Sequence, residues 1–196
     1  FILLLNSDTI VLPGTLERMV EFARRRPEAG ILGCKLVRPS GELDWACRRG
    51  FPTPLVAFYK FLGLHRILPR SRVFGRYNMT YLDPGVPSDV DSVVGACMLV
   101  RGECLSSVGP LDERFWMYGE DLDWCYRFKK RGWRVLYNPE ARCIHYEGVS
   151  SGLKKSTQKI TQADKSTKLK TTQAFYDAMK IFYRKHYQDE YPTLLN

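Results

Sequence analysis

The 196-residue sequence predicts an α/β fold, a mixed sheet flanked by helices, on three observations. Short apolar segments typical of strands alternate with segments in which apolar residues recur at helical spacing. The expected order, β-α-β-β-α-loop-β-α-α-β-β-α, suits a mixed sheet and not a helical bundle or a sandwich. Hydrophobic residues form 44% of the chain and aromatic residues 13%, enough for one sizeable core and too much for a disordered chain.

The first elements are expected to be a strand, a helix and a hairpin. Residues 1–5 are apolar without alternation, which suits a parallel strand covered on both faces. Because the sequence begins inside this strand without an initiator Met, we expect a fragment whose upstream βαβ units are missing. Pro13 is well placed to begin a helix that ends before Pro27. Residues 29–37 and 43–49 then read as the two strands of a hairpin.

The later elements follow from the same signals. In chain order they are a short helix to about residue 64, a basic loop over 66–90, a strand over 92–100, a helix over 102–108, a helix over 120–131, two short strands over 133–137 and 141–146, and a long basic helix over about 165–187. Gly95 and Ala96 remove side-chain bulk from their strand, so another backbone or a ligand is expected to come close there.

Composition limits the class of protein. The six cysteines form no C-x-x-C pair and have apolar neighbours, so we expect them to be reduced and buried, which favours a cytoplasmic location. No apolar run approaches the roughly 18 to 20 residues of a membrane-spanning helix, and no signal peptide is recognisable.

Much of the net charge of +9 lies in residues 151–196, which hold nine Lys/Arg and four Asp/Glu. The cationic amphipathic helix expected there has two possible roles. It could pack its apolar face on the domain, or it could attach the protein peripherally to an anionic membrane surface. Nucleic-acid binding is disfavoured, because no recognition motif is present and no aromatic residues alternate with Lys/Arg on a strand.

Asp8 is the first candidate site residue. It follows the first strand, and ligands of open α/β sheets bind where such strands end. A carboxylate there can hold Mg²⁺ or Mn²⁺. Alternatively, Asn6 and Asp8 only shape a turn before the next helix.

Two acidic residues begin the helix over 120–131, directly after an aromatic segment. Glu120 and Asp121 point about 100° apart on a helix, so we expect only one of them to face a site. As a general base, such a carboxylate needs desolvation to raise its pKa against the lowering effect of the helix dipole. The alternative is that both acids only favour the helix dipole.

His145 is the one histidine in an apolar strand, and it fits either a hydrogen-bonded core residue or a metal ligand. His65 and His186 lie in surface-like helical contexts and receive no role.

Five motifs gain specificity when taken together, in order and spacing. They are LLNSD (4–8), DSVVGACMLVR (91–101), GPLDERF (109–115), YGEDLDWCYR (118–127) and PEARCIH (139–145). The chain resembles the later half of a family 2 inverting glycosyltransferase, with a truncated GT-A (Rossmann-like) fold, and most closely the bacterial rhamnosyltransferase-like members. The resemblance covers 1–152 as the C-terminal part of the GT-A domain, lacking the N-terminal nucleotide-binding part. Residues 153–196 form a linker and the basic amphipathic C-terminal helix.

The resemblance implies roles for several residues. Asp8 matches the last acid of the family's D-x-D motif, which binds the metal and the nucleotide diphosphate, and His145 matches a further metal ligand. Asp121, beside Glu120, matches the catalytic base. Asn6 departs from the family pattern, because a neutral amide replaces the first acid. The remaining implied contacts are with the donor at Asn6, Ser7, Gly95 and Ala96, and with the acceptor at Trp116 and Tyr118.

The implied activity is transfer of a sugar, with rhamnose from dTDP-rhamnose as the candidate. The donor is a nucleotide-diphosphate sugar, the acceptor a cell-envelope polysaccharide or lipid-linked glycan, and the cofactor Mn²⁺ or Mg²⁺, with inversion by single displacement. The expected location is cytoplasmic, or peripheral on the inner face of the cell membrane through the C-terminal helix. A non-catalytic sugar- or nucleotide-binding domain of the same fold is the alternative. A glycoside hydrolase would need neither Asp8 nor His145.

Overall fold

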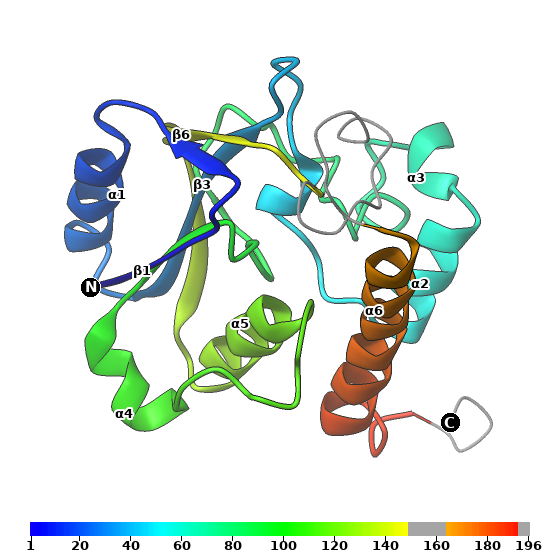
Figure 1. Cartoon of the computed structure of the whole chain (residues 1–196). Helices are drawn as coiled ribbons and strands as arrows, with labels where there is room; N and C mark the ends of the chain where they lie inside the picture. Colours follow the sequence, from blue (N-terminus) through cyan, green and yellow to red (C-terminus); the bar gives the residue numbers. More distant parts are fainter. Residues whose placement is uncertain (149–163, 192–196) are drawn as a thin grey trace.

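The computed structural model describes residues 1–148 and 164–191, which form a six-stranded mixed sheet flanked by helices (Figure 1). The sheet order is β1-β5-β3-β6-β2, with β4 also paired to β6. The strands are β1 (Ile2–Leu5), β2 (Thr9–Val11), β3 (Ala29–Val37), β4 (Ser88–Asp89), β5 (Cys97–Val100) and β6 (Arg134–His145). Strands β3 and β6 run parallel, whereas β1 and β3 on β5, and β2 and β4 on β6, are antiparallel. The predicted mixed α/β fold is confirmed.

Six α-helices surround this sheet in the described residues. They are α1 (Thr15–Arg24), α2 (Pro54–Phe61), α3 (Leu64–Ile67), α4 (Leu105–Val108), α5 (Glu120–Lys130) and α6 (Lys165–His186). Figure 1 shows α1 and α5 on opposite sides of the sheet, and both contribute to the core. Helix α5 approaches β3 closely at Gly30. A side chain there would overlap the Phe128 ring, so the approach requires glycine. This close packing holds the C-terminal half of α5 against β3.

The first strand differs from its prediction. Strand β1 pairs antiparallel with β5 and lies at the end of the strand order, with Ile2 43% and Leu5 45% exposed. The prediction of a parallel strand covered on both faces is therefore wrong for this structure. A run of apolar residues indicates a strand, but whether that strand is parallel or antiparallel depends on the strand with which it pairs.

The predicted hairpin is only half correct. Strand β3 and the following turn are present, with the Arg38 amide donating to the Glu42 carbonyl at 2.8 Å. The returning strand over 43–49 is wrong, because a 3₁₀ turn at Trp45–Cys47 replaces it. The Asp44 carboxylate accepts a hydrogen bond from the Ala46 amide at 3.0 Å, and this local contact competes with extended pairing.

Two other strand predictions need new boundaries. The two short strands expected around Asn138 form one strand, β6, whose pairing with β3 shifts register between Cys34 and Lys35. The strand expected over 92–100 is regular only as β5, from Cys97 onward.

Helix α6 packs its apolar face on the domain, which is the first of the two roles expected for it. Its buried residues Ala178 and Phe182 join a cluster with Phe115, Leu122 and Tyr126. Within the described residues, no helix combines the length and the apolar character needed to cross a bilayer.

Buried polar contacts with α5 also hold α6 in place. The Asp123 carboxylate accepts from Lys185 and His186, each at 2.7 Å, and from Arg127 of its own helix at 2.8 Å. The surface context expected for His186 is therefore wrong, because its side chain is only 6% exposed.

Candidate functional site

Asp8 and His145 lie side by side at one end of the sheet. Asp8 occupies the turn between β1 and β2, and Thr9 of β2 pairs with His145 of β6. The Tyr146 amide donates to the Asp8 carbonyl at 2.9 Å, which fixes the turn against the end of β6. Asp8 Oδ1 then lies 3.5 Å from His145 Nε2. Asn6 and Ser7, in the same turn, have exposed side chains.

A third residue, Asp44, holds the other side of the imidazole. His145 Nδ1 donates to Asp44 Oδ2 at 2.7 Å, and both side chains are buried. Burial alone would raise the pKa of Asp44, but the hydrogen bond from His145 lowers it below its usual value. Sequence analysis missed Asp44 because it placed residues 43–49 in a strand. The available signal was a carboxylate within an otherwise apolar segment.

The surroundings of His145 favour a positive charge. Burial would lower the pKa of this imidazole, but Asp44 and Asp8 outweigh that effect and raise it to about 9. Asp8 Oδ1 is buried and accepts no hydrogen bond from the described residues. Asp44 takes Nδ1 and Nε2 is directed at Asp8, so loss of the Nε2 proton to an incoming cation would give the arrangement in which a histidine binds a metal with a carboxylate behind it. The residues present therefore fit a divalent cation between Asp8 and His145.

Asp121 lies in the first turn of α5 and is buried. Its Oδ2 accepts from Arg49 at 2.8 Å and from the Gly95 amide at 3.0 Å, and its Oδ1 accepts from the Leu122 amide at 2.6 Å. Burial would lower the pKa of Arg49, but the Asp121 carboxylate raises it above its usual value, so the guanidinium stays charged. Sequence analysis missed Arg49, whose only signal was a pair of adjacent arginines before a glycine.

The Gly95–Ala96 segment connects these two groups of residues. Its Ala96 carbonyl accepts from the Asn6 amide at 3.1 Å, and its Gly95 amide donates to Asp121. The turn that carries Asp8 and the helix start that carries Asp121 therefore border the same short segment. A Cβ on Gly95 would lie 3.7 Å from the Asp121 Cβ, an ordinary contact, so the expected close approach of a ligand at this glycine stays a prediction.

Glu120 and Asp123 have different surroundings from Asp121. Burial, followed by the neighbouring Asp121 charge, raises the pKa of Glu120 to about 7. Glu120 Oε2 is buried and has no donor among the described residues. Asp123 is fully buried against α6 by the contacts described above, away from any open site.

The aromatic residues before α5 contact α6. The Tyr118 ring packs edge-on against Phe175 of α6, with 6.1 Å between ring centroids. Trp116 is 71% exposed and borders a cavity of about 740 Å³ between residues 114–117 and α6. Of the two predicted acceptor residues, Trp116 thus lines a cavity that includes the C-terminal helix, and Tyr118 contacts that helix at Phe175.

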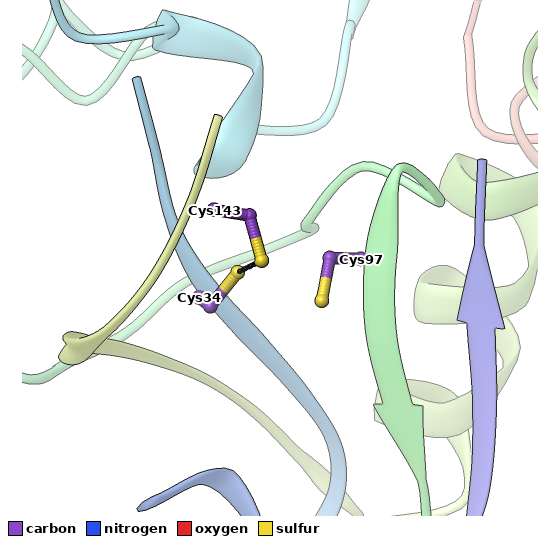
Figure 2. Close-up of side chains that lie close together, drawn as sticks. All are labelled: Cys34, Cys97 and Cys143. Atoms are coloured by element: carbon purple, nitrogen blue, oxygen red, sulfur yellow. Dashed lines mark hydrogen bonds between the residues drawn. The ribbon is translucent and has the colours of Figure 1, made fainter. Parts of the chain in front are cut away.

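Three cysteine sulfurs also lie close together, within 4.8 Å of one another (Figure 2). Cys34 Sγ is 3.6 Å from Cys143 Sγ, and Cys97 faces them from β5. All six cysteines are free and buried, which confirms that prediction. Sulfur ligands suit soft metals and not Mg²⁺ or Mn²⁺, so this cluster is distinct from the predicted metal site.

Comparisons with known proteins place this geometry in a family. The model for glycosyltransferase like family 2 matches residues 1–166. The chain is 31% identical to an N-acetylglucosaminyl-diphospho-decaprenol L-rhamnosyltransferase of Mycobacterium tuberculosis (strain ATCC 25618 / H37Rv), over 78% of this chain and 48% of that protein. It is 34% identical to the O-antigen biosynthesis protein RfbC of Myxococcus xanthus, over 76% of this chain and 11% of that protein.

A further relative is the rhamnosyltransferase WbbL of Escherichia coli (strain K12), at 27% identity over 74% of this chain and 52% of that protein. The chain spans about half the length, or less, of these curated relatives. Because the family model covers most of the sequence, the chain belongs to glycosyltransferase family 2.

Proposed function

We propose that the protein containing this chain is a metal-dependent inverting glycosyltransferase. Its donor is a nucleotide-diphosphate sugar, and its acceptor is a glycan or lipid-linked glycan of the cell envelope. The observation that carries the proposal is that Asp8 lies beside His145, and that the turn with Asp8 (through Asn6) and Asp121 both hydrogen-bond to the segment Gly95–Ala96. The names of the relatives support rhamnose as the transferred sugar, and dTDP as its carrier stays part of the proposal.

Asp8 and His145 would hold the cation, Mn²⁺ or Mg²⁺. When bound, such an ion neutralises charge on a departing diphosphate. Asp44 keeps the imidazole oriented through Nδ1, and Asn6 and Ser7 present exposed polar groups beside Asp8. Because Asn6 is neutral, the site has fewer charged ligands than the family's D-x-D motif offers. Asp44 partly compensates by adding a second carboxylate next to the histidine.

The acceptor proton goes to a carboxylate at the start of α5. Asp121 Oδ1 accepts only the Leu122 amide within the described residues, so a lone pair remains for the hydroxyl proton. Arg49 and the Gly95 amide hold the other oxygen and fix the orientation of the group. Glu120 is the competing base, because its pKa of about 7 suits proton transfer near neutral pH.

Variants of the full-length protein test this proposal. Transfer would be measured with Mn²⁺ and three donors, dTDP-rhamnose, a uridine-linked sugar and a guanosine-linked sugar, to identify the donor. We expect Asp121→Asn to lower kcat by about 10²- to 10⁴-fold, the usual contribution of a general base. Binding of the donor, measured by calorimetry, should change less than about twofold, because the carboxylate acts on the acceptor.

Two comparisons complete the test. Glu120→Gln decides between the two carboxylates, and Asp189→Asn, at an exposed position, is the matched control. Full transfer by both the Asp121 and the Glu120 variants would contradict a base at this position. Donor binding without transfer by the unaltered protein would instead support the non-catalytic alternative.

The protein's location is part of the proposal. Lys165, Lys180 and Arg184 of α6 are exposed and face away from its buried residues, and Tyr176 on the same side is 59% exposed. Cations next to an exposed aromatic ring suit the surface of an anionic bilayer. The proposed location is therefore cytoplasmic, with peripheral contact to the inner face of the membrane through α6.

A further inference from the structure

The cavity beside Trp116 lies next to the start of α5. Residues 114–117 form one of its sides, and the outer residues of α6 from Leu169 to Ile181 form the other. Its wall reaches the residue before Glu120, because a Cβ on Gly119 would lie 3.3 Å from that of Ala178, a cavity residue. At about 740 Å³ the cavity is within the range of small-molecule sites, roughly 300 to 1,000 Å³.

The walls of the cavity are mainly apolar and poorly covered. Trp116 is 71% and Leu169 73% exposed, and Met117, Ala174 and Ile181 add apolar surface. Exposed apolar surface of this kind marks a binding site, because leaving it in water costs about 25 cal/mol per Å².

The polar groups of the cavity distinguish between possible ligand classes. The Gln173 amide donates to the Asp177 carboxylate at 3.0 and 3.1 Å, and Arg114 pairs with Asp112 at 2.7 Å. Lys170 has no ion-pair partner within residues 1–148 and 164–191. A free sugar needs many hydrogen-bonding groups, and most of those here are already paired. A long apolar chain next to a phosphate needs only the apolar walls and a cation.

We propose that this cavity binds the apolar chain of a phosphate-linked lipid acceptor, with Lys170 directed to the phosphate. The inference rests on the proposed function, because it assigns the lipid part of the acceptor of that same reaction. It gives α6 a direct role in binding, since one wall of the cavity belongs to this helix. A sugar attached beyond the phosphate would extend toward Glu120 and Asp121.

Binding is tested first with a soluble probe. Farnesyl phosphate would be titrated into the full-length protein by calorimetry, and saturable binding is expected. Ala174→Trp, which fills the cavity, and Leu169→Glu, at an exposed position where folding is not at stake, should each weaken binding at least tenfold. Glu17→Trp, at an exposed position of α1 outside the cavity, is the matched control and should leave binding unchanged.

The chemistry of the probe separates the alternatives. Equal binding of inorganic phosphate would show that charge alone is recognised, and equal binding of dihexanoyl phosphatidic acid would show general affinity for membrane lipids. Either result, or unchanged binding of farnesyl phosphate by both cavity variants, would overturn the inference.

A transfer assay separates this inference from the proposed function. The same acceptor sugar would be offered on farnesyl diphosphate and as a methyl glycoside. The cavity variants should raise KM at least tenfold for the first acceptor relative to the second. An unchanged ratio would reject the cavity inference and leave the proposed transferase intact. Failure of the unaltered protein to use either acceptor would instead count against the transferase, and the binding titration would still decide the role of the cavity.

Discussion

At the scale of single residues, the candidate site depends on buried polar side chains from four separate parts of the chain. Asp8, Asp44 and His145 form one hydrogen-bonded and charged group, and Arg49 with Asp121 forms the other. Such buried groups are stable only when each charge has a partner, because an unpaired buried charge costs several kcal/mol. Their pairing positions the site and restricts which substitutions the fold tolerates.

The role of Asp44 can be tested through metal binding. We expect Asp44→Asn in the full-length protein to weaken Mn²⁺ affinity by about 10- to 100-fold, the usual effect of losing a partner behind a metal-binding histidine. The amide can still accept from His145 Nδ1, but it lacks the negative charge that strengthens the imidazole as a ligand. Electron paramagnetic resonance of free Mn²⁺ measures the affinity directly. Asp83→Asn, in an exposed loop, is the control, and equal affinity in all three proteins would contradict the role.

The raised pKa of Glu120 predicts a pH-dependent change in stability. The pKa of this group is about 7 in the folded protein and about 4.5 in the unfolded chain, so its ionisation disfavours folding. Its contribution to stability is complete below pH 4.5 and is lost as the pH rises through 7. Glu120→Gln should therefore gain stability over the unaltered protein at pH 8 relative to pH 5, by about 2.5 kcal/mol for a shift of this size. Urea unfolding at both pH values measures it, and the same difference at each would show that Glu120 has no such shift.

The sequence predicted the acids of the candidate site better than their partners. Asp8, Asp121 and His145 could be named because each lies next to the end of an element, and the structure places Asp8 beside His145. Asp44 and Arg49 could not be named, because each belongs to the irregular segment 43–49 and acquires its role only through contacts more than 70 residues away. Long-range pairing of this kind leaves no local pattern in a sequence.

At the scale of elements, periodicity predicted helices more reliably than strand pairing. Helices α1, α5 and α6 occur close to their expected positions, because an amphipathic face reports burial whatever the partner is. The direction of β1 depends on β5, which lies more than 90 residues later. The second hairpin strand was lost because Asp44 bonds both to Ala46 and to His145, and those contacts outweigh a local strand tendency.

The docking of α6 should depend on Asp123. Asp123→Ala removes the buried carboxylate that accepts from Arg127, Lys185 and His186, so His186 loses this partner and Lys185 keeps only Asp112. Breaking a buried ion pair costs about 3 to 5 kcal/mol, so α6 should open more often. We expect amide hydrogen exchange over 165–186 to become at least tenfold faster, measured by mass spectrometry. The control is Asp189→Asn, and unchanged protection of α6 in the Ala variant would show that apolar packing alone holds the helix.

At the scale of the whole molecule, the C-terminal region of the chain is more basic than the part that forms the sheet. Residues 151–196 hold nine of the 30 Lys/Arg residues but only four of the 21 Asp/Glu residues. The mixed sheet of the GT-A type thus carries the acidic candidate site, and the C-terminal region carries a concentrated positive charge. This separation suits a protein that binds a metal at one place and an anionic surface at another.

Vesicle flotation tests the proposed membrane contact at this scale. Replacing Lys165, Lys180 and Arg184 by Glu reverses charge on the exposed side of α6 without changing its buried residues Thr171, Ala178 and Phe182. Each cation near an anionic leaflet contributes about 1 kcal/mol, so the triple variant should lose most of its binding to vesicles rich in phosphatidylserine. Neutral vesicles should bind both proteins equally weakly, and raising the salt concentration should release the unaltered protein because the Debye length shortens. Equal flotation of both proteins on the anionic vesicles would reject a membrane role for α6.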